Sequence, residues 1–303
     1  MQFTNIYNLP PELVRAIKYR SYQLQGDISV TGLINPPRIT QLQKRHYDEI
    51  TDDVSNYVWS LFGSSVHIIL ERSKDIHNES LVEQLLRINV NNWIVSGTAD
   101  HYDGATKTLS DYKTTNSYAV QTLKPEWKMQ LNIYAYMFRK AGFNVNKLQI
   151  VALIKDWMYS KALYNKKFPQ SEVVVIKVQK MKDSEILSYI EQRVKLHQEA
   201  ENMSDDELPE CTSEEKWEVP TKYAVMKSGA KRAIKLCKTE ETAQRMLDDL
   251  EEQKGTNDYY IETRPGECIR CDRSRPGTDT PMYCNVRTWC KYWRLRNNQD
   301  IPF

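Results

Sequence analysis

The spacing of apolar residues predicts helices in the N-terminal part of the chain. Two segments, 10–17 and 36–42, open with a Pro pair and continue with apolar residues three and four positions apart, as helices do. A longer apolar stripe runs from Val54 to Ile69, after Thr51-Asp52-Asp53, which resembles a helix N-cap with an acidic first turn. We therefore expect a helical segment over residues 1–50 and a long helix after it.

Strand-forming segments follow, and their order outlines a core. Residues 106–113 fit a strand after the turn signal Asp103-Gly104, and residues 148–155 form the nearly continuous apolar run of a buried strand. Residues 173–178 are rich in β-branched side chains. Helices are predicted after Pro125 and after Asp183. The order of helix, hairpin or three strands, helix and strand predicts an α/β (α+β) fold.

Beyond residue 200 the composition changes. Residues 201–218 are acidic and polar, as a linker is, whereas residues 222–238 carry basic and no acidic side chains and read as a hairpin. A helix and a strand after the hairpin complete a small ββαβ unit. We expect the following segments: an N-terminal helical segment 1–50, a core 51–203, an acidic linker 204–220, a basic ββαβ appendage 221–265 and a Cys-rich tail 266–303.

Composition narrows the class of protein without naming a partner. The 303 residues are 40% hydrophobic and 27% charged, and the formal net charge is +2. No apolar run approaches the ~20 residues of a transmembrane helix, and Met1-Gln-Phe-Thr-Asn lacks the pattern of a signal peptide. We therefore expect a cytoplasmic protein without membrane contact.

Two acidic residues and a lysine are the first candidates for chemistry. Asp111 and Lys113 lie two apart on a predicted strand, so their side chains share a face. A two-residue loop at Asp103-Gly104 would place Asp100 opposite Lys107, roughly 13 Å along the strand from Asp111. A four-residue loop, 104–107, would instead place Asp100 opposite Asp111, with Cβ atoms roughly 5 Å apart. Two such carboxylates repel unless a cation lies between them, so we predict the longer loop and a divalent metal.

Three more residues belong to the candidate site. Gln130 and Tyr134 lie four positions apart and share a face of the predicted helix, where an amide and a phenol can orient a phosphate or the lysine. His67 lies off the apolar stripe of the preceding helix. A lone helical histidine is commonly structural, but its position before the carboxylates favours a metal ligand.

Taken together, Gly97-x2-Asp100, Asp111-x-Lys113 and Gln130-x3-Tyr134, after His67, resemble the RecB-like branch of the PD-(D/E)XK nuclease superfamily. The motifs cover residues 54–140. The resemblance implies a restriction-endonuclease-like core with a mixed central sheet flanked by helices. The flanking segments more weakly resemble phage- and prophage-borne members of this branch. The resemblance implies a bacterial protein that a phage could encode.

The resemblance implies a Mg²⁺- or Mn²⁺-dependent deoxyribonuclease. Asp100 and Asp111, with His67 and the carbonyl of Tyr112, would hold the metal, and Lys113 would orient or deprotonate the attacking water. We expect an exonuclease of recombination, repair or phage DNA processing that acts on single-stranded DNA or duplex ends. The alternative is a nucleic-acid-binding metalloprotein without cleavage, which acts as a loading or assembly factor.

All six cysteines lie after residue 210, and four of them form Cys268-x2-Cys271 and Cys284-x5-Cys290. Clustered cysteines with a C-x2-C pair favour a metal over disulfides in a reducing compartment, and four thiolates suit zinc or an iron–sulfur cluster. AddB-type and CRISPR-associated adaptation nucleases have a similar tail with an iron–sulfur cluster. This chain departs from their spacing, since they would have a cysteine at Pro281 and a distant one before the histidine helix. Cys211 is therefore an alternative to Cys268, and Cys237 is predicted to be core.

The basic hairpin is the last candidate surface. Lys231 and Arg232 lie near its tip and could track a phosphate backbone. A solvated strand face is the alternative interpretation.

Overall fold

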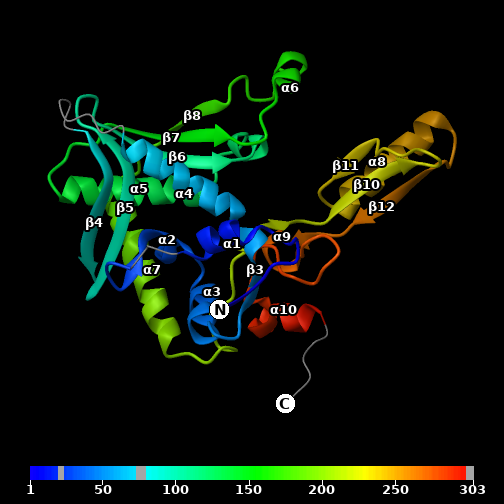
Figure 1. Ribbon diagram of the computed structural model, residues 1–303. Helices are drawn as coiled ribbons and strands as arrows, with labels where there is room; N and C mark the ends of the chain where they lie inside the picture. Colours follow the sequence, from blue (N-terminus) through cyan, green and yellow to red (C-terminus); the bar gives the residue numbers. More distant parts are fainter. Residues whose placement is uncertain (20–23, 73–79, 298–303) are drawn as a thin grey trace. The chain divides into compact units, whose positions relative to one another are not determined.

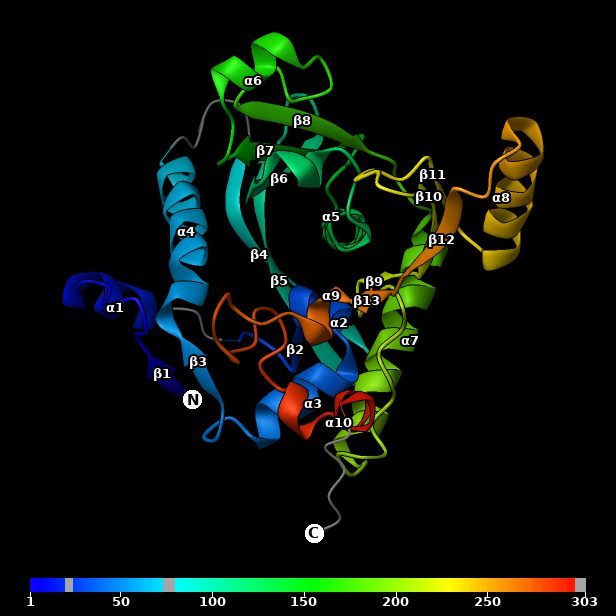
Figure 2. The same ribbon diagram turned by 90° about the vertical axis from the view of Figure 1, so that its right-hand side faces the viewer.

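The computed structural model describes residues 1–19, 24–72 and 80–297. The chain divides into two compact units, Met1–Pro209 and Glu210–Phe303 (Figures 1 and 2).

A mixed sheet forms the centre of the first unit. Its strands are β2 (Ile28–Ser29), β4 (Leu81–Val90), β5 (Trp93–Asp103), β6 (Thr108–Thr115), β7 (Lys147–Ile154) and β8 (Val173–Val178). They follow the order β2-β5-β6-β7-β8, and β4 pairs with β5. The pairs β2/β5 and β6/β7 are parallel, whereas β4/β5, β5/β6 and β7/β8 are antiparallel. The predicted mixed α/β architecture with a mixed sheet is thus confirmed.

Helices cover both faces of this sheet. The helices of the first unit are α1 (Pro11–Lys18), α2 (Val30–Ile34), α3 (Pro37–Arg45), α4 (Val58–Glu71), α5 (Pro125–Lys140), α6 (Tyr159–Tyr164) and α7 (Asp183–Glu201), of which α1 packs on α4 and α6 projects beyond β8. Helices α1, α3 and α5 begin at a proline, as the sequence predicts. Figure 2 shows α4 on one side of strands β4–β6 and α5 on the other.

The core of the first unit lies between the sheet and helices α5 and α7. Helix α5 buries Leu131 and Phe138, and α7 buries Ile190 with its neighbours one turn away. Asn132 is fully buried on α5, and its amide donates to the carbonyl of Gln179 and accepts from the backbone N–H of Met181. This side chain fixes the approach to α7, because a buried amide is stable only with its partners in place.

The segment 51–57 differs from the sequence-based expectation. Thr51–Asp53 forms a short strand, β3, which pairs in parallel with β1 (Gln2–Thr4), and it is followed by a 3-10 turn, η1 (Val54–Tyr57). The long helix therefore starts at Val58 instead of after residue 53. Asp53 still caps a helical turn, because its carboxylate accepts from the N–H of Ser55. Cross-strand pairing outside the local segment decided this, and local propensity could not reveal it.

The second unit contains the predicted ββαβ arrangement. It comprises β9 (Glu218–Val219), β10 (Lys222–Lys227), β11 (Lys235–Cys237), α8 (Glu240–Lys254), β12 (Tyr259–Arg264), β13 (Glu267–Cys268), α9 (Ile269–Asp272), η3 (Arg287–Trp289) and α10 (Lys291–Arg296). Strands follow the order β11-β10-β12, and Thr239 caps α8 as expected. Cys237 is buried against Val225 and Ala243, which confirms its core position.

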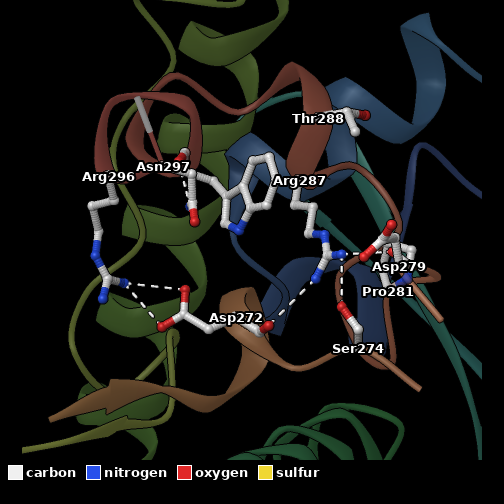
Figure 3. A pocket seen from close by; sticks show the side chains of 9 residues that line it. Asp272, Ser274, Asp279, Pro281, Arg287, Thr288, Arg296 and Asn297 are labelled. Carbon is white, nitrogen blue, oxygen red and sulfur yellow. Dashed lines mark hydrogen bonds and ion pairs between the residues drawn. The ribbon is translucent and has the colours of Figure 1, made fainter. Parts of the chain in front are cut away.

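A buried arginine braces the Cys-rich part of this unit. Arg287 donates to the Ser274 hydroxyl at 2.8 Å and to the Asp279 carbonyl at 2.7 Å (Figure 3). Arg296 pairs with Asp272 at 3.1 Å on the opposite side of the same polar pocket. These charges are satisfied within the unit, so the pocket serves to fold the loop between α9 and η3.

The boundary between the units falls within the predicted acidic linker. The buried Arg38 donates to the carbonyls of Leu208 and Pro209, so the first half of the linker belongs to the first unit. The appendage 221–265 and the tail 266–303 lie together in the second unit. None of the described helices is both long and apolar enough to span a membrane.

The contact between α3 and the end of α7 generates a pH prediction. His46 Nε2 lies 2.6 Å from Asp205, and Nδ1 lies 2.8 Å from Glu49. Burial alone would lower the pKa of His46, but the two carboxylates outweigh it and raise the pKa above its usual range. The folded protein therefore binds this proton more tightly than the unfolded chain. The stability it contributes is complete below about pH 6.5 and is lost as the pH rises through the folded pKa.

As the pH rises through the folded pKa of His46, we expect the unfolding free energy of the wild type to fall further than that of His46→Gln, by about 1 kcal/mol or less. Urea titrations at a series of pH values between about 6 and 9 measure the unfolding free energy of both proteins. Subtracting one curve from the other cancels the contribution of the other histidines. Parallel pH curves for the two proteins would contradict this assignment.

Candidate metal and phosphodiester site

The hairpin between β5 and β6 determines where the two candidate carboxylates lie. The pairs His101↔Ser110, Tyr102↔Leu109 and Asp103↔Thr108 leave a four-residue loop, 104–107. The Asp103 carboxylate closes this loop by accepting from the N–H groups of Ala105 and Thr106. The prediction of the longer loop is confirmed, and the register points Asp100 toward Asp111.

Strands β5 and β6 separate just beyond the last pair. Instead of a ladder bond, the Asp100 carboxylate accepts from the backbone N–H of Tyr112 at 2.6 Å. Asp111 is 2% exposed, and the Lys113 ammonium lies 3.0 Å from its Oδ1 and 2.9 Å from its Oδ2. The contact with Oδ2 is an ion pair without hydrogen-bond geometry, and Oδ2 accepts no other bond among the described residues. A buried oxygen with unused lone pairs is suited to a cation.

The electrostatics of the pair favour positive charge between the strands. Burial raises the pKa of Asp100 to about 7, and the charge of Asp111 adds to this rise. Burial also raises the pKa of Asp111, although Lys113 lowers it. Burial disfavours the ionised form of both carboxylates, and the charge of Asp111 disfavours ionisation of Asp100 further. A divalent cation bound here would offset both effects.

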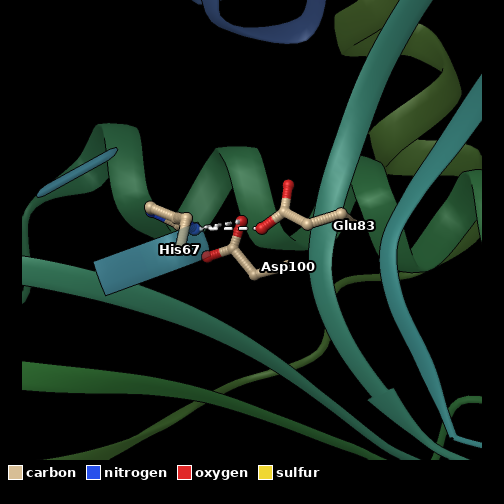
Figure 4. Close-up of side chains that lie close together, drawn as sticks. All are labelled: His67, Glu83 and Asp100. Carbon is tan, nitrogen blue, oxygen red and sulfur yellow. Dashed lines mark hydrogen bonds and ion pairs between the residues drawn. The ribbon is translucent and has the colours of Figure 1, made fainter. Parts of the chain in front are cut away.

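His67 and Glu83 complete the cluster. His67 Nδ1 lies 3.1 Å from Glu83 Oε1 and 3.7 Å from Asp100 Oδ1 (Figure 4). One ligand atom from each of these three residues lies within 4.8 Å of the others. The hydrogen bond to Glu83 outweighs the effect of burial, so the pKa of His67 is raised above its usual value. The three residues come from α4, β4 and β5, and an imidazole with two carboxylates could hold a divalent metal.

Sequence reasoning missed Glu83. The β4/β5 ladder is continuous in register but omits the Glu83–Asp100 pair, and Glu83 has a φ of +49°. A glutamate in this region of backbone space is strained, and such strain concentrates at functional sites. The available signal was an acidic residue inside the apolar segment 81–86.

Gln130 of α5 binds the lysine, and Tyr134 of the same helix supports Gln130. Gln130 Oε1 accepts from Lys113 Nζ at 3.0 Å, and Gln130 Nε2 donates to the Tyr134 hydroxyl at 3.4 Å. Tyr134 is only 4% exposed, so it supports Gln130 from the interior and is not placed to contact a substrate. Of the alternatives that the sequence left open, the contact of Gln130 with the lysine is present, and the burial of Tyr134 does not fit a direct contact of the tyrosine with a phosphate.

Gly97 explains the spacing of the first motif. A Cβ at this position would lie 2.6 Å from Tyr134 Cε1 and 2.9 Å from Val30 Cγ2. Only glycine lets the Tyr134 ring approach β5 this closely. Gly97 thus belongs to the support of the lysine, three residues before Asp100.

The second candidate site is the group of cysteines in the second unit. Burial raises the pKa of Cys271 to about 12, and further rises come from the nearby thiols of Cys284, Cys211, Cys268 and Cys290. Burial likewise raises the pKa of Cys211 to about 12, with Glu215, Cys284 and Cys290 adding to it. Cys211, Cys268, Cys284 and Cys290 are therefore all near Cys271, and Cys284 and Cys290 are also near Cys211.

Cys268 also has a side-chain partner outside the cysteines. Its sulfur lies 3.2 Å from the Tyr292 hydroxyl, and the Tyr292 ring lies beneath the Lys216 ammonium at 4.0 Å. Near Cys211 in the chain, the Arg270 side chain donates to the carbonyl of Glu215, and the Arg270 N–H donates to the carbonyl of Lys216. Both Cys211 and Cys268 thus lie near Cys271, and Cys268 is the one whose thiol contacts Tyr292.

The spacing of the thiols limits what they could hold. In the described part of the chain, no three cysteine sulfurs lie within 4.8 Å of one another. Tetrahedral zinc with Zn–S bonds of ~2.3 Å brings its sulfurs to about 3.8 Å from one another. A four-iron cluster is larger than a single ion and needs its thiolates further apart.

Comparison with known proteins adds little to this geometry. No protein-family model matches the sequence, and no curated protein matches it. Seven chains among the solved structures match. One is described as the crystal structure of SSO0001, with 20% identity and a TM-score of 0.42 over 61% of this chain and 84% of that chain. Functional inference therefore rests on the site itself.

Gly97→Ala tests the support of the lysine. We expect it to lower the unfolding free energy by ~1–3 kcal/mol, because the new methyl group overpacks Tyr134. Gly63→Ala is the matched control: its Cβ would meet nothing within 4 Å in α4, so stability should hold or rise by up to ~1 kcal/mol. Urea unfolding of both variants measures this. Equal stability of Gly97→Ala and the wild type would show that Tyr134 can move away.

Proposed function

We propose that this chain is a divalent-metal-dependent nuclease that hydrolyses DNA phosphodiester bonds on a restriction-endonuclease-like core. The observation that carries the proposal is the convergence of Asp100, Asp111 and Lys113 with His67 and Glu83. Four separate elements, α4, β4, β5 and β6, supply charged groups to one partly buried place, at the cost of burying carboxylates and straining Glu83. Proteins retain such arrangements at functional sites.

The donor set suits Mg²⁺ or Mn²⁺. His67, Glu83, Asp100 and Asp111 would hold the ion, together with the carbonyl of Tyr112. Hard oxygen ligands predominate, as these ions prefer, and the unused lone pairs of Asp111 Oδ2 fit a cation. When bound, the metal would supply a more acidic water and neutralise charge on the scissile phosphate.

Lys113 supplies the remaining charge. Its ammonium is held by Asp111 and Gln130, so it is fixed in direction beside the carboxylates. From this position it orients the attacking water and offsets negative charge that develops on the phosphate. Phosphoryl transfer depends mainly on such placement, and no covalent nucleophile is required. The bare carboxylates would repel the DNA backbone, which argues against a binding module without cleavage.

We further propose that the enzyme is an exonuclease of recombination, repair or phage DNA processing. The basic pair Lys231 and Arg232 is exposed between β10 and β11 and provides a second candidate contact for phosphates.

Substitution of the site residues tests the nuclease assignment. We expect Asp111→Asn and Lys113→Ala to lower cleavage by roughly 100-fold or more, because each removes a charge that acts on the reacting phosphate. Glu83→Gln should raise the Mg²⁺ concentration needed for half-maximal rate, roughly ten-fold, since it weakens one ligand. The assay uses end-labelled single- and double-stranded DNA with Mg²⁺, Mn²⁺ or EDTA.

Two variants control for loss of charge alone. Asp48 is 98% exposed on its side chain, and Lys147 is exposed at the start of β7, so Asp48→Asn and Lys147→Ala should cleave normally. Near-normal turnover of Asp111→Asn, or cleavage that persists in EDTA, would refute the proposed site.

For the second unit, we propose that Cys211, Cys271, Cys284 and Cys290 hold an iron–sulfur cluster. No three cysteine sulfurs of the described residues lie within 4.8 Å of one another, and a cluster needs its thiolates further apart than a single zinc ion does. The position of Cys268 beside Tyr292 supports Cys211 as the fourth ligand.

Serine variants distinguish the two ligand sets. Purified anaerobically, the wild type should contain iron and sulfide, and Cys211→Ser or Cys284→Ser should lose both and melt at a lower temperature. Cys268→Ser is the control and should keep its iron, because a serine hydroxyl can still bond to Tyr292. Iron loss from Cys268→Ser but not from Cys211→Ser, or zinc in place of iron, would reject this assignment.

A further inference from the structure

Three segments meet where β6 and β7 end, close to the proposed nuclease site. The N–H of Lys155, just past β7, donates to the carbonyl of Thr115 at 2.9 Å, and Thr115 is two residues beyond Lys113. Asp156 accepts from the N–H and hydroxyl of Ser117 at 2.6 and 2.9 Å, which fixes the turn η2 (Ser117–Val120) beside it. The Lys155 ammonium lies 4.1 Å above the ring of Trp59, at the start of α4.

Large aromatic side chains are exposed on these segments. Tyr118 in η2 is 81% exposed, Tyr159 in α6 is 71% exposed and Trp59 is 53% exposed. Figure 1 shows α6 projecting away from the sheet beyond β8. The connection that carries α6 is held in place, since Trp157 Nε1 donates to the Pro169 carbonyl at 2.9 Å. Rings presented to solvent on a fixed scaffold indicate a binding surface.

Lysines are interleaved with the aromatic rings. Partial burial lowers the pKa of Lys155, Asp156 raises it, and the charge of Lys124 lowers it further, so the two lysines are near one another. Slight burial raises the pKa of Asp156, but bonds from Ser117 lower it below its usual range, and Lys161 lowers it further. The carboxylate of Asp156 is hydrogen-bonded by Ser117, and the three ammonium groups lie over aromatic rings: Lys155 over Trp59, Lys124 over Trp127 and Lys161 over Phe168. An ammonium over a ring keeps donors that can contact a phosphate.

We propose that Trp59, Tyr118 and Tyr159, with Lys124, Lys155 and Lys161, bind an unpaired nucleic-acid strand and lead it to Lys113. Bases stack on the exposed rings while the lysines contact the phosphates, the combination by which proteins hold single strands. A duplex would cover its bases and leave the rings unused. This inference rests on the proposed nuclease function, because it assigns the form of substrate that the same site receives. A protein that docks on the same rings is the rival occupant.

Binding is measured separately from cleavage, by fluorescence anisotropy in EDTA. The probes are an unpaired oligonucleotide, a strand of the same length with abasic sites in place of bases, and a duplex. We expect the wild type to bind the unpaired strand most tightly. Tyr118→Ala or Tyr159→Ala should weaken that binding roughly ten-fold and hardly change binding of the abasic strand. Tyr118→Phe keeps the ring and should bind normally.

Matched controls come from the same unit. Tyr47 is a half-exposed tyrosine beside α3, so Tyr47→Ala should bind as the wild type does. Lys124→Ala with Lys155→Ala should flatten the salt dependence by about 0.7 per lost contact, whereas Lys195→Ala in α7 should not.

The outcomes separate this inference from the nuclease proposal. The stacking surface is refuted if the tyrosine variants bind the unpaired strand as tightly as the wild type does, or if they lose affinity for the abasic strand equally. It is also refuted if the wild type binds the duplex most tightly or binds none of the probes. Mg²⁺-dependent cleavage could persist in any of those cases. Conversely, ring-dependent binding without any cleavage would uphold this surface and refute the proposed nuclease.

Discussion

Two buried carboxylates that the hairpin register brings together impose the constraint on which the first unit depends. The charge of Asp111 disfavours ionisation of Asp100, and burial adds to the cost of ionising each carboxylate. The fold offsets the cost locally with the N–H of Tyr112 for Asp100 and the ammonium of Lys113 for Asp111. The arrangement remains short of positive charge, and a divalent metal would supply it.

The packing around this pair fixes the lysine rather than the carboxylates. Lys113 is held by Gln130, Gln130 by Tyr134, and Tyr134 by the absence of a side chain at Gly97. This chain of contacts joins α5 to β5 and β6. A shift of any one member moves the ammonium, so a residue far from the phosphate controls the geometry at the site. Glu83 adds a strained backbone on the opposite strand.

The second unit illustrates a different source of stability. Around Cys237 its apolar core is small, whereas the Cys-rich part buries thiols and one arginine. Arg287 holds the loop between α9 and η3 through backbone carbonyls and Ser274, and this brings Cys284 toward Cys271. A cluster bound by these thiols would contribute its binding energy directly to folding.

The sequence by itself determined the elements and the members of the site. Proline starts placed α1, α3 and α5, apolar runs placed β7 and β8, and the spacing of Asp100, Asp111 and Lys113 identified the hairpin. These signals are local, because helical and strand periods and turn residues act over a few positions. Tertiary structure alone decided the role of Glu83, the strand at Thr51–Asp53 and the contact between Cys268 and Tyr292. Each depends on a partner distant in the chain: Glu83 on His67 of α4, Thr51–Asp53 on the N-terminal strand, and Cys268 on Tyr292 of α10. Pairing across such distances is set by the packing of the whole unit, and no local pattern encodes it.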